Sequence, residues 1–241
     1  MTRGEKLVDE ILTGSSRDVG VAANQLLAEF SRGLSLGHLR CLLTSERSEV
    51  VRSGVWIASE LGRSSQPVIE EVGRLLNHGE EYVRFFAIDS LLTTTGREHG
   101  ELVARVIGLM DDQSAAVRQK VLDFLARASA SQLESAADWL EHNEPSKMEL
   151  VPKLRRLLNH GAIDGTRLAE ALQSESAIDR KLGAVAAIRY GALDTEILAS
   201  AANAPDPEIR GIAKSAQATR QRRQEHDARF KSKGRTPRRG S

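Results

Sequence analysis

The sequence predicts an all-α protein, a right-handed α-solenoid of about seven helical hairpins. Three observations lead to this prediction. A valine–arginine pair followed by aliphatic residues occurs three times, and its arginines, Arg52, Arg84 and Arg118, lie 32 and then 34 residues apart. Apolar residues around each pair recur every three or four positions, as in an amphipathic helix, and no segment alternates convincingly as a strand does. Helical units that repeat at this length stack into solenoids, because none can bury its apolar face alone.

The repeat extends beyond these three copies. Arg180 and Arg210 continue it toward the C-terminus, and Lys147 takes the arginine's place in the copy before Arg180. Upstream, Gly20 occupies that place, 32 residues before Arg52. We therefore expect seven copies of roughly 31 residues, with residues 1–219 forming the solenoid.

Each copy is expected to contain two helices. An earlier apolar stretch precedes each valine–arginine helix, as Leu102, Val106 and Leu109 do before Val117. The connectors TSERSE, NHGEE, DDQSA and NAPDPE carry the Asp, Asn, Ser and Pro residues that begin helices. Pro152 falls inside one second helix, and we expect it to kink that helix or to reset its start.

The segments DDQSAAVRQKVLDFLARAS and SERSEVVRSGVWIASELG, each a polar turn followed by valine–arginine and apolar residues, resemble the HEAT repeat. The bacterial variety found in proteins similar to phycobilisome lyase subunits matches best, over nearly the whole chain. This resemblance implies a stack of hairpins whose second helices line a concave surface. It implies little about function, because the fold serves many roles.

The recurring arginines have two interpretations. They could form a basic ladder for phosphate groups, or each guanidinium could bridge an acidic turn residue, such as Glu46, Asp111 or Asp206, and cap carbonyls between units. We favour the structural role, because residues in the repeat register usually hold the stack together.

The concave face implied by the resemblance is the candidate site for a partner protein. Positions one, five and eight after the arginine share one face of a helix. The residues at these positions are Ser53, Ile57 and Glu60; Phe85, Asp89 and Leu92; and Gln119, Asp123 and Ala126. Carboxylates among apolar groups predict an acidic groove that binds a basic protein, and the alternative is an ordinary solvated face.

Composition restricts the class of protein. The 40% of hydrophobic residues suffices for a core, and Cys41 is the one cysteine, so no internal disulfide forms. We expect a cytoplasmic protein, because no charged-then-apolar leader opens the chain. We expect no membrane partner either, because apolar runs are far shorter than the roughly 20 residues of a bilayer span.

Charge is unevenly distributed along the chain. Residues 214–241 carry 10 Lys and Arg against Glu225 and Asp227, a net charge of +8, whereas residues 1–213 carry 24 basic and 31 acidic residues, a net charge of −7. We expect residues 220–241 to form a disordered basic tail, because they have no apolar face. The tail could contact phosphate weakly through Arg220, Arg222, Arg223, Arg229, Lys231, Lys233, Arg235, Arg238 and Arg239.

Catalytic, metal and cofactor motifs are not apparent. The six histidines are scattered, with no HExxH spacing, and no cysteine pair or glycine-rich phosphate loop occurs. Alkylpurine DNA glycosylases resemble stacked HEAT units, but that resemblance implies aromatic residues around a catalytic aspartate, and only 4% of this chain is aromatic. Trp56 and Trp139 are interpreted as core residues. A lyase similar to phycobilisome chromophore lyases would need a bilin.

Taken together, these features predict a non-enzymatic protein-binding module that needs no cofactor. Its role could be that of a scaffold, an adaptor, or an inhibitor of immunity type that clamps a basic toxin or enzyme. Two alternatives remain: a nucleic-acid-associated protein that uses the basic tail, and an enzyme of the glycosylase or chromophore-lyase type. The sequence does not identify the partner or the oligomeric state.

Overall fold

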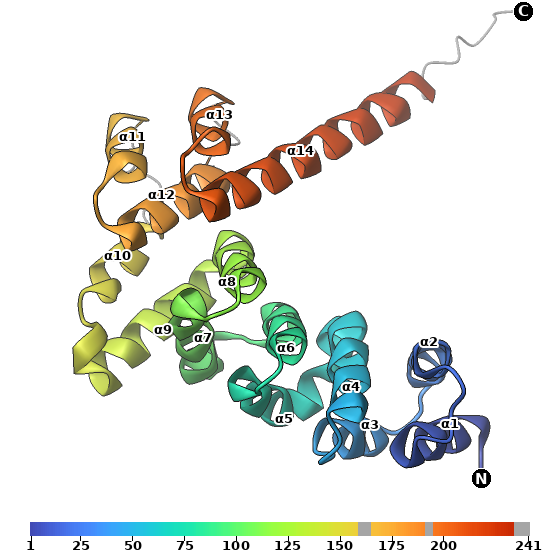
Figure 1. Cartoon of the computed structure of the whole chain (residues 1–241). Helices are drawn as coiled ribbons and strands as arrows, with labels where there is room; N and C mark the ends of the chain where they lie inside the picture. The colour runs from blue at the N-terminus through green and yellow to red at the C-terminus, as the bar shows by residue number, and fades with distance from the viewer. Residues whose placement is uncertain (159–164, 191–194, 234–241) are drawn as a thin grey trace, which may run out of the picture. The chain divides into compact units, whose positions relative to one another are not determined.

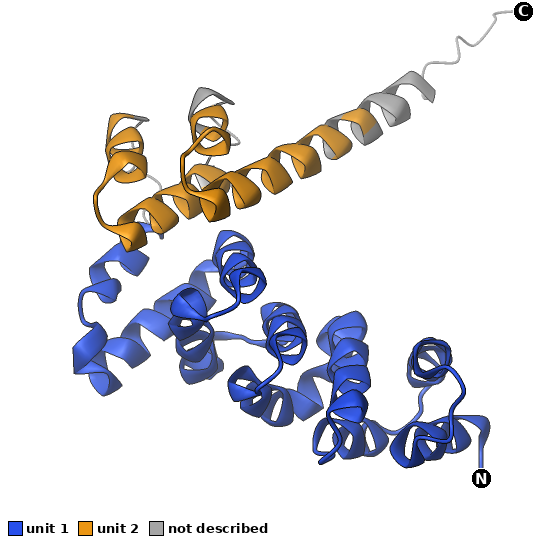
Figure 2. Ribbon diagram, in the orientation of Figure 1, with its two compact units in different colours: residues 1–159 blue, residues 160–241 orange. Residues whose placement is uncertain are grey.

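The computed structural model describes residues 1–158, 165–190 and 195–233, and within these ranges it contains helices and no strand (Figure 1). The chain divides into two compact units, residues 1–159 and residues 160–241 (Figure 2). This boundary falls between the fifth and sixth hairpins, and the expected division at residue 219 between solenoid and tail stays a prediction.

Hairpins of a first and a second helix make up both units. Unit 1 holds α1 (Arg3–Thr13) and α2 (Val19–Ser31), α3 (Leu36–Leu43) and α4 (Ser48–Leu61), α5 (Ile69–Arg74) and α6 (Glu81–Thr94), α7 (Gly100–Gly108) and α8 (Ala115–Arg127), and α9 (Ala130–Asn143) and α10 (Leu150–Arg156). Unit 2 holds α11 (Gly165–Gln173) and α12 (Ala177–Tyr190), and α13 (Thr195–Ala202) and α14 (Pro207–Lys233). The described residues thus confirm the predicted all-α fold built from helical hairpins.

In unit 1 the second helices form a continuous layer. Helix α2 packs on α4, α4 on α6, and α6 on α8, while each first helix lies against its own second helix (Figure 1). The core between them contains fully buried aliphatic side chains such as Leu39, Leu42, Ile88 and Leu122. Burying one such side chain contributes about 1.5–3 kcal/mol, so the stack depends on this apolar seam.

In each of four hairpins, an arginine binds the turn between the two helices in the same way. This arginine is the fourth residue of the second helix, and its Nη1 donates to the carbonyls six and five residues earlier. The bonds are Arg84 to His78 and Gly79 (2.7 and 2.9 Å), Arg118 to Asp112 and Gln113 (2.6 and 3.1 Å), Arg180 to Ser174 and Glu175 (2.7 Å each), and Arg210 to Ala204 and Pro205 (2.8 and 2.5 Å). These arginines are therefore structural, as predicted.

One of the four arginines also joins two hairpins. The guanidinium of Arg84 donates from Nε and Nη2 to the two carboxylate oxygens of Asp112, at 2.8 Å each. Both side chains are only 6% exposed. The acidic partner, Asp112, is a turn residue two positions before Ser114, the N-cap of α8, and it adjoins Asp111, which the sequence suggested as an example of such a residue.

The sequence register was wrong in two copies. Gly20 is the second residue of α2, because the carboxylate of Asp18 caps that helix by accepting the Val21 N–H. Lys147 lies in a short 3₁₀ turn, η5 (Pro145–Lys147), before α10 begins. Neither residue occupies the arginine's position.

Pro152 stands in the first turn of α10, where its missing N–H costs no helical hydrogen bond, so the helix begins beside it.

The register is also displaced in α4, by one residue. This helix begins at Ser48, so Arg52 is its fifth residue and the buried Val51 is its fourth. Gly54 is the seventh residue of α4, as Gly183 is of α12, and both sit where the second helix approaches the first closely. A Cβ on Gly54 would lie 2.9 Å from Leu42 Cβ, and one on Gly183 would lie 3.0 Å from Ala171 Cβ.

The basic C-terminal segment is helical where it is described. Helix α14 continues to Lys233, whereas residues 220–241 were expected to be disordered. Residues 212–233 contain neither glycine nor proline and are rich in Ala, Arg, Gln and Lys, which favour a helix without tertiary contacts. Gln221 bonds Glu225 one turn away at 3.0 Å. Arg235, Arg238 and Arg239 lie outside the described residues.

The buried ion pair gives a stability prediction. Arg84→Ala is expected to lower the free energy of unfolding by about 3–5 kcal/mol, because it leaves the buried carboxylate of Asp112 unpaired. Urea unfolding followed by circular dichroism measures this change. The matched control is Arg127→Ala, which removes an exposed arginine paired with Asp123 and should cost at most about 1 kcal/mol. Equal losses in the two variants would contradict the structural role of Arg84.

Acid should weaken the same contact. Burial raises the pKa of Asp112, but hydrogen bonds from Arg84 and the Ser114 N–H, with the charges of Arg84 and Arg118, outweigh burial and lower this pKa below its ordinary value of 3.8. The contribution to stability is therefore complete above about pH 4 and is lost as pH falls through the folded pKa. In unfolding measured over a pH series, Asp112→Asn should be less stable at pH 7 and should lose less stability on acidification. An unchanged pH dependence in this variant would show that Asp112 is not responsible.

Candidate functional site

The second helices of unit 1 present a row of partly or fully exposed side chains, here called the second-helix face. These side chains recur every three or four residues along three neighbouring helices. They are Glu49, Arg52, Trp56, Ser59 and Glu60 on α4; Tyr82, Phe85, Phe86, Asp89 and Leu92 on α6; and Gln119, Lys120, Asp123, Ala126 and Arg127 on α8.

On α6 and α8 the residues predicted for the site lie on the second-helix face. Phe85, Asp89, Gln119 and Asp123 are all partly exposed on this face. Sequence spacing identified them because both helices begin three residues before their arginine.

On α4 the prediction fails for two of three residues. Ile57 is fully buried, and Ser53 is 8% exposed with its hydroxyl donating to the Glu49 carbonyl at 3.1 Å. Glu60 is exposed, as expected. The one-residue shift of Arg52 rotates the assigned face by about 100°, since a helix has about 3.6 residues per turn. Moving each position back by one residue gives Arg52, Trp56 and Ser59, which are exposed or partly exposed.

Aromatic side chains gather on this face. Of the chain's nine aromatic residues, four partly exposed ones, Trp56, Tyr82, Phe85 and Phe86, lie on α4 and α6. The ring centroids of Tyr82 and Phe86 are 4.6 Å apart, and those of Phe85 and Phe86 are 5.2 Å apart. Trp56 was expected in the core, but it is only partly buried, and so is Trp139 on α9. A helical repeat alone does not show which aromatic residues stay at the surface.

A cation stacks on each end of the aromatic group. The Arg52 guanidinium carbon lies 4.9 Å from the centroid of Tyr82, and Lys120 Nζ lies 4.7 Å from that of Phe85. Such contacts contribute about 0.5–1 kcal/mol at exposed sites. They hold the long basic side chains against the rings and leave polar edges beside an apolar surface.

Of the three carboxylates in the predicted acidic groove, the two on α6 and α8, Asp89 and Asp123, are already paired. Lys120 Nζ contacts Asp89 closely and lies 3.7 Å from Asp123. Arg127 contacts Asp123 closely and lies 3.7 Å from Asp89. Two acids and two bases therefore balance, and this part of the face is locally neutral. The −7 net charge of residues 1–213 does not concentrate here.

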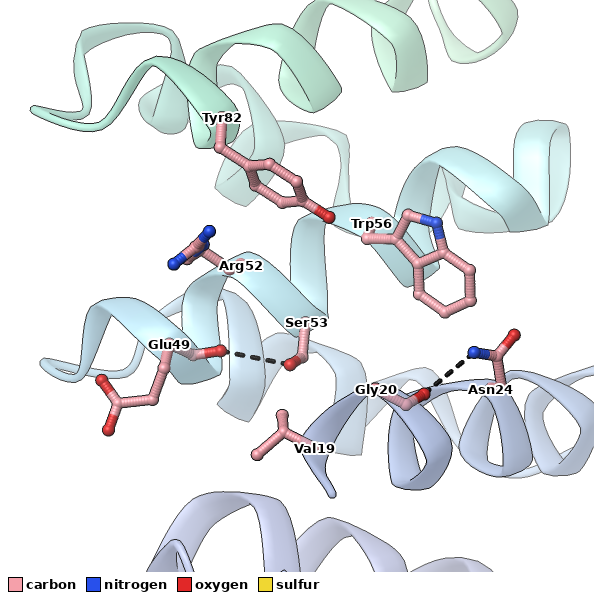
Figure 3. Close-up of a pocket in the computed structure, with 8 residues that line it drawn as sticks. All are labelled: Val19, Gly20, Asn24, Glu49, Arg52, Ser53, Trp56 and Tyr82. Atoms are coloured by element: carbon pink, nitrogen blue, oxygen red, sulfur yellow. Dashed lines mark hydrogen bonds between the residues drawn. The ribbon is translucent and has the colours of Figure 1, made fainter.

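A pocket of about 510 Å³ opens where α2, α4 and α6 meet. It is lined by Val19, Gly20, Asn24, Glu49, Arg52, Ser53, Trp56 and Tyr82. The Tyr82 ring lies between the side chains of Arg52 and Trp56, and α2 supplies Val19 and Asn24 on the opposite side (Figure 3). We call it the Trp56 pocket.

A smaller hollow of about 370 Å³, lined in part by Arg97, Trp139 and His142, lies elsewhere, on α9 and the residues before α7.

The polar groups of the Trp56 pocket are partly unused. Asn24 Nδ2 donates to the Gly20 carbonyl at 2.9 Å, which leaves its carbonyl oxygen available. Within the described part of the chain, neither the Tyr82 hydroxyl nor the Trp56 indole N–H has a hydrogen-bond partner. The acidic lining residue is Glu49, whose pKa is lowered by hydrogen bonds from its own backbone amide and from Arg47. The glycosylase alternative requires an aspartate at such a place.

The described part of the chain lacks two kinds of feature. No group of three or more His, Cys, Asp or Glu side chains is arranged there to hold a metal ion. None of the helices combines the length and the apolar composition that a bilayer span requires.

Comparison with known proteins finds similar structures at low identity. The chain is similar to an archaeal HEAT-like repeats protein from Thermococcus onnurineus NA1, with 13% identity and a TM-score of 0.49 over 90% of this chain and 96% of that one. It is also similar to a designed armadillo repeat protein in complex with peptide (KR)4 (15%, TM-score 0.43, 90% and 99%) and to an engineered protein (19%, TM-score 0.48, 90% and 95%). No family model and no curated protein matches the chain. The case for a function therefore comes from its own residues.

The register of α4 can be checked directly. Ile57→Ala should lower the free energy of unfolding by about 2–5 kcal/mol, because it opens a cavity in the core. Trp56→Ala should cost clearly less, although the side chain it removes is larger, because Trp56 is partly exposed. Chemical unfolding of both variants measures the difference. A greater loss for Trp56→Ala would place the tryptophan, not the isoleucine, in the core.

Proposed function

We propose that the chain is a non-enzymatic binding module that holds a segment of another protein on the second-helix face of unit 1. The observation that carries this proposal is the aromatic group of Trp56, Tyr82, Phe85 and Phe86, partly exposed on two neighbouring helices. Aromatic residues are enriched in the cores of protein interfaces, where they supply most of the binding energy. A chain so poor in aromatic residues gains no stability from leaving nearly half of them partly in water.

The extent of the face favours a macromolecular partner over a small molecule. It crosses α4, α6 and α8, which pack side by side, so a partner could contact three helices at once. Contiguous apolar surface rimmed by polar residues is typical of protein interaction sites. The Trp56 pocket at one end would receive an anchoring side chain, and the neutral Lys120–Asp89 cluster would form part of the rim.

The paired charges modify the expectation of a basic partner. A basic protein would have to displace Lys120 and Arg127 from Asp89 and Asp123, and the gain in attraction would be offset by the lost pairs. Apolar and aromatic contact is therefore proposed as the main source of affinity. An adaptor would join this partner to a second one, whereas an inhibitor of immunity type would occlude it; loss of the partner's activity in the complex would identify the inhibitor.

The competing hypothesis is phosphate binding through the basic segment. Arg220, Arg222, Arg223, Arg229, Lys231 and Lys233 all lie on α14, so the segment would present a cationic helix. Such binding is electrostatic and should fall steeply with salt. This hypothesis predicts that binding requires residues 219–241 and does not require the second-helix face.

A capture experiment with matched variants tests the two hypotheses. The full chain, Trp56→Ala/Tyr82→Ala, Trp139→Ala and a chain ending at Ala218 are immobilised, and retained material is identified at two salt concentrations. We expect one stoichiometric protein that is retained by the full chain, by Trp139→Ala and by the shortened chain. Its affinity, then measured with purified components, should fall at least about tenfold in the double variant, as for a buried aromatic anchor.

Trp139 is the control because it is a tryptophan on α9, outside the second-helix face. A partner retained equally by the double variant would contradict the proposed site. Nucleic acid lost at high salt and lost with residues 219–241 would instead support the competing hypothesis.

A further inference from the structure

Arg52 departs from the structural pattern of the other repeat arginines. Arg84, Arg118, Arg180 and Arg210 each use Nη1 to hold two turn carbonyls. Arg52 stands one residue later in its helix, and its side chain makes no hydrogen bond within the described part of the chain. Its side chain is 51% exposed, and its contacts are the ring of Tyr82 and an ion pair from Nε to Glu80 Oε2 at 3.6 Å.

Another arginine performs the joining role in this hairpin. Arg47 Nη1 donates to the Leu12 carbonyl of the preceding hairpin at 2.9 Å. Arg47 also donates to the carboxylate of Glu49 from Nε at 3.0 Å and from Nη2. The guanidinium of Arg52 therefore holds no turn carbonyl, and it lies at the edge of the Trp56 pocket instead (Figure 3).

We propose that the Trp56 pocket binds a segment of a partner protein in which a large apolar or aromatic side chain stands beside a carboxylate. This inference rests on the proposed function and specifies its anchor. The apolar side chain would lie against Trp56, Tyr82 and Val19, and the carboxylate would accept hydrogen bonds from Arg52. Arginine suits this task because its planar fork of donors pairs with both oxygens of a carboxylate.

The acidic groups near the pocket leave Arg52 accessible. The Glu49 carboxylate is held by Arg47 and points away from the pocket centre (Figure 3). Glu80 Oε2 lies 3.6 Å from Arg52 Nε, beyond hydrogen-bond distance, and no other described residue accepts a hydrogen bond from this guanidinium. Contact with the Tyr82 ring restrains the Arg52 side chain in advance, which reduces the ordering that binding would otherwise require.

The remaining pocket groups suit a peptide backbone. The free carbonyl oxygen of Asn24 can accept a backbone N–H, and the indole N–H of Trp56 can donate to a carbonyl. The volume of about 510 Å³ accommodates one large side chain, and it lies within the range of about 300–1,000 Å³ that ligand pockets usually have. The carboxylate could belong to an Asp or Glu side chain or to the end of a chain.

The first step of the test is selection from displayed random peptides, half of the library with a free C-terminus and half with the random segment internal. The bait is the full chain carrying Trp139→Phe, so that Trp56 is its single tryptophan. We expect the recovered peptides to share an aromatic or large aliphatic residue within a few positions of a carboxylate. Enrichment of Asp and Glu indicates a side-chain source, whereas enrichment confined to free C-termini indicates a terminal one.

The second step measures the affinity of one synthetic peptide through Trp56 fluorescence. Arg52→Gln should weaken binding at least about tenfold, as expected for loss of a charge-assisted hydrogen bond. Arg127→Gln, an equally exposed arginine on the same face, should change it less than about twofold. Converting the peptide's carboxylate to an amide should weaken its binding to the parent protein by a similar factor. The amide peptide should bind Arg52→Gln about as tightly as it binds the parent protein, because the two changes remove the same interaction.

The outcomes separate this inference from the proposed function. Calorimetry on the Trp56→Phe and Tyr82→Ala variants shows whether a peptide needs these two residues. A peptide that needs both, but binds Arg52→Gln as tightly as it binds the parent protein, would overturn the carboxylate inference and leave the proposed binding face in place. Peptides whose affinity is unchanged by all three substitutions would overturn both the carboxylate inference and the proposed binding face. Recovery of no peptide, or of peptides enriched in Lys and Arg, would overturn the inference about this pocket.

Discussion

Hairpins of two helices leave carbonyl groups unpaired in their turns, and the arginines that bind these carbonyls are the constraint on which the rest of the structure depends. A turn carbonyl buried without a donor costs about 1–3 kcal/mol. Arginine can supply several donors from one side chain and remains charged at any ordinary pH. Arg84 goes further than the other three, because its remaining donors fix the carboxylate of Asp112 and so set the position of the fourth hairpin on the third.

The same constraint explains why the candidate site lies where it does. In α4 the helix starts one residue earlier relative to its arginine, and the buried fourth position is taken by Val51. Arg52 therefore turns to the exposed side together with Trp56. In this copy the repeat arginine thus holds no turn carbonyl, while Gly54 lets α4 approach Leu42 of α3 closely.

Local pairing, not net charge, decides the electrostatic character of the second-helix face. Asp89 and Asp123 are acidic in the sequence, but α8 brings Lys120 and Arg127 against them. The result is a neutral rim beside an aromatic surface, which favours partners that contribute apolar area. On the described part of this face, Lys120 and Arg127 are in close contact with carboxylates, whereas the nearest carboxylate oxygen to Arg52 lies 3.6 Å away. The setting of Arg52 beside Tyr82 gives the pocket its polarity.

The sequence by itself determined the helical hairpins and their number, because these depend on contacts three and four residues apart and on local capping. It also identified the exposed positions of α6 and α8, such as Phe85 and Asp123. Only the tertiary structure decided the start of α4, since its N-cap, Arg47, makes no side-chain cap that a sequence pattern could reveal. It alone decided that Arg84 meets Asp112, 28 residues away, and that Trp56 with Tyr82 forms a pocket, because such pairings depend on how far apart neighbouring helices pack.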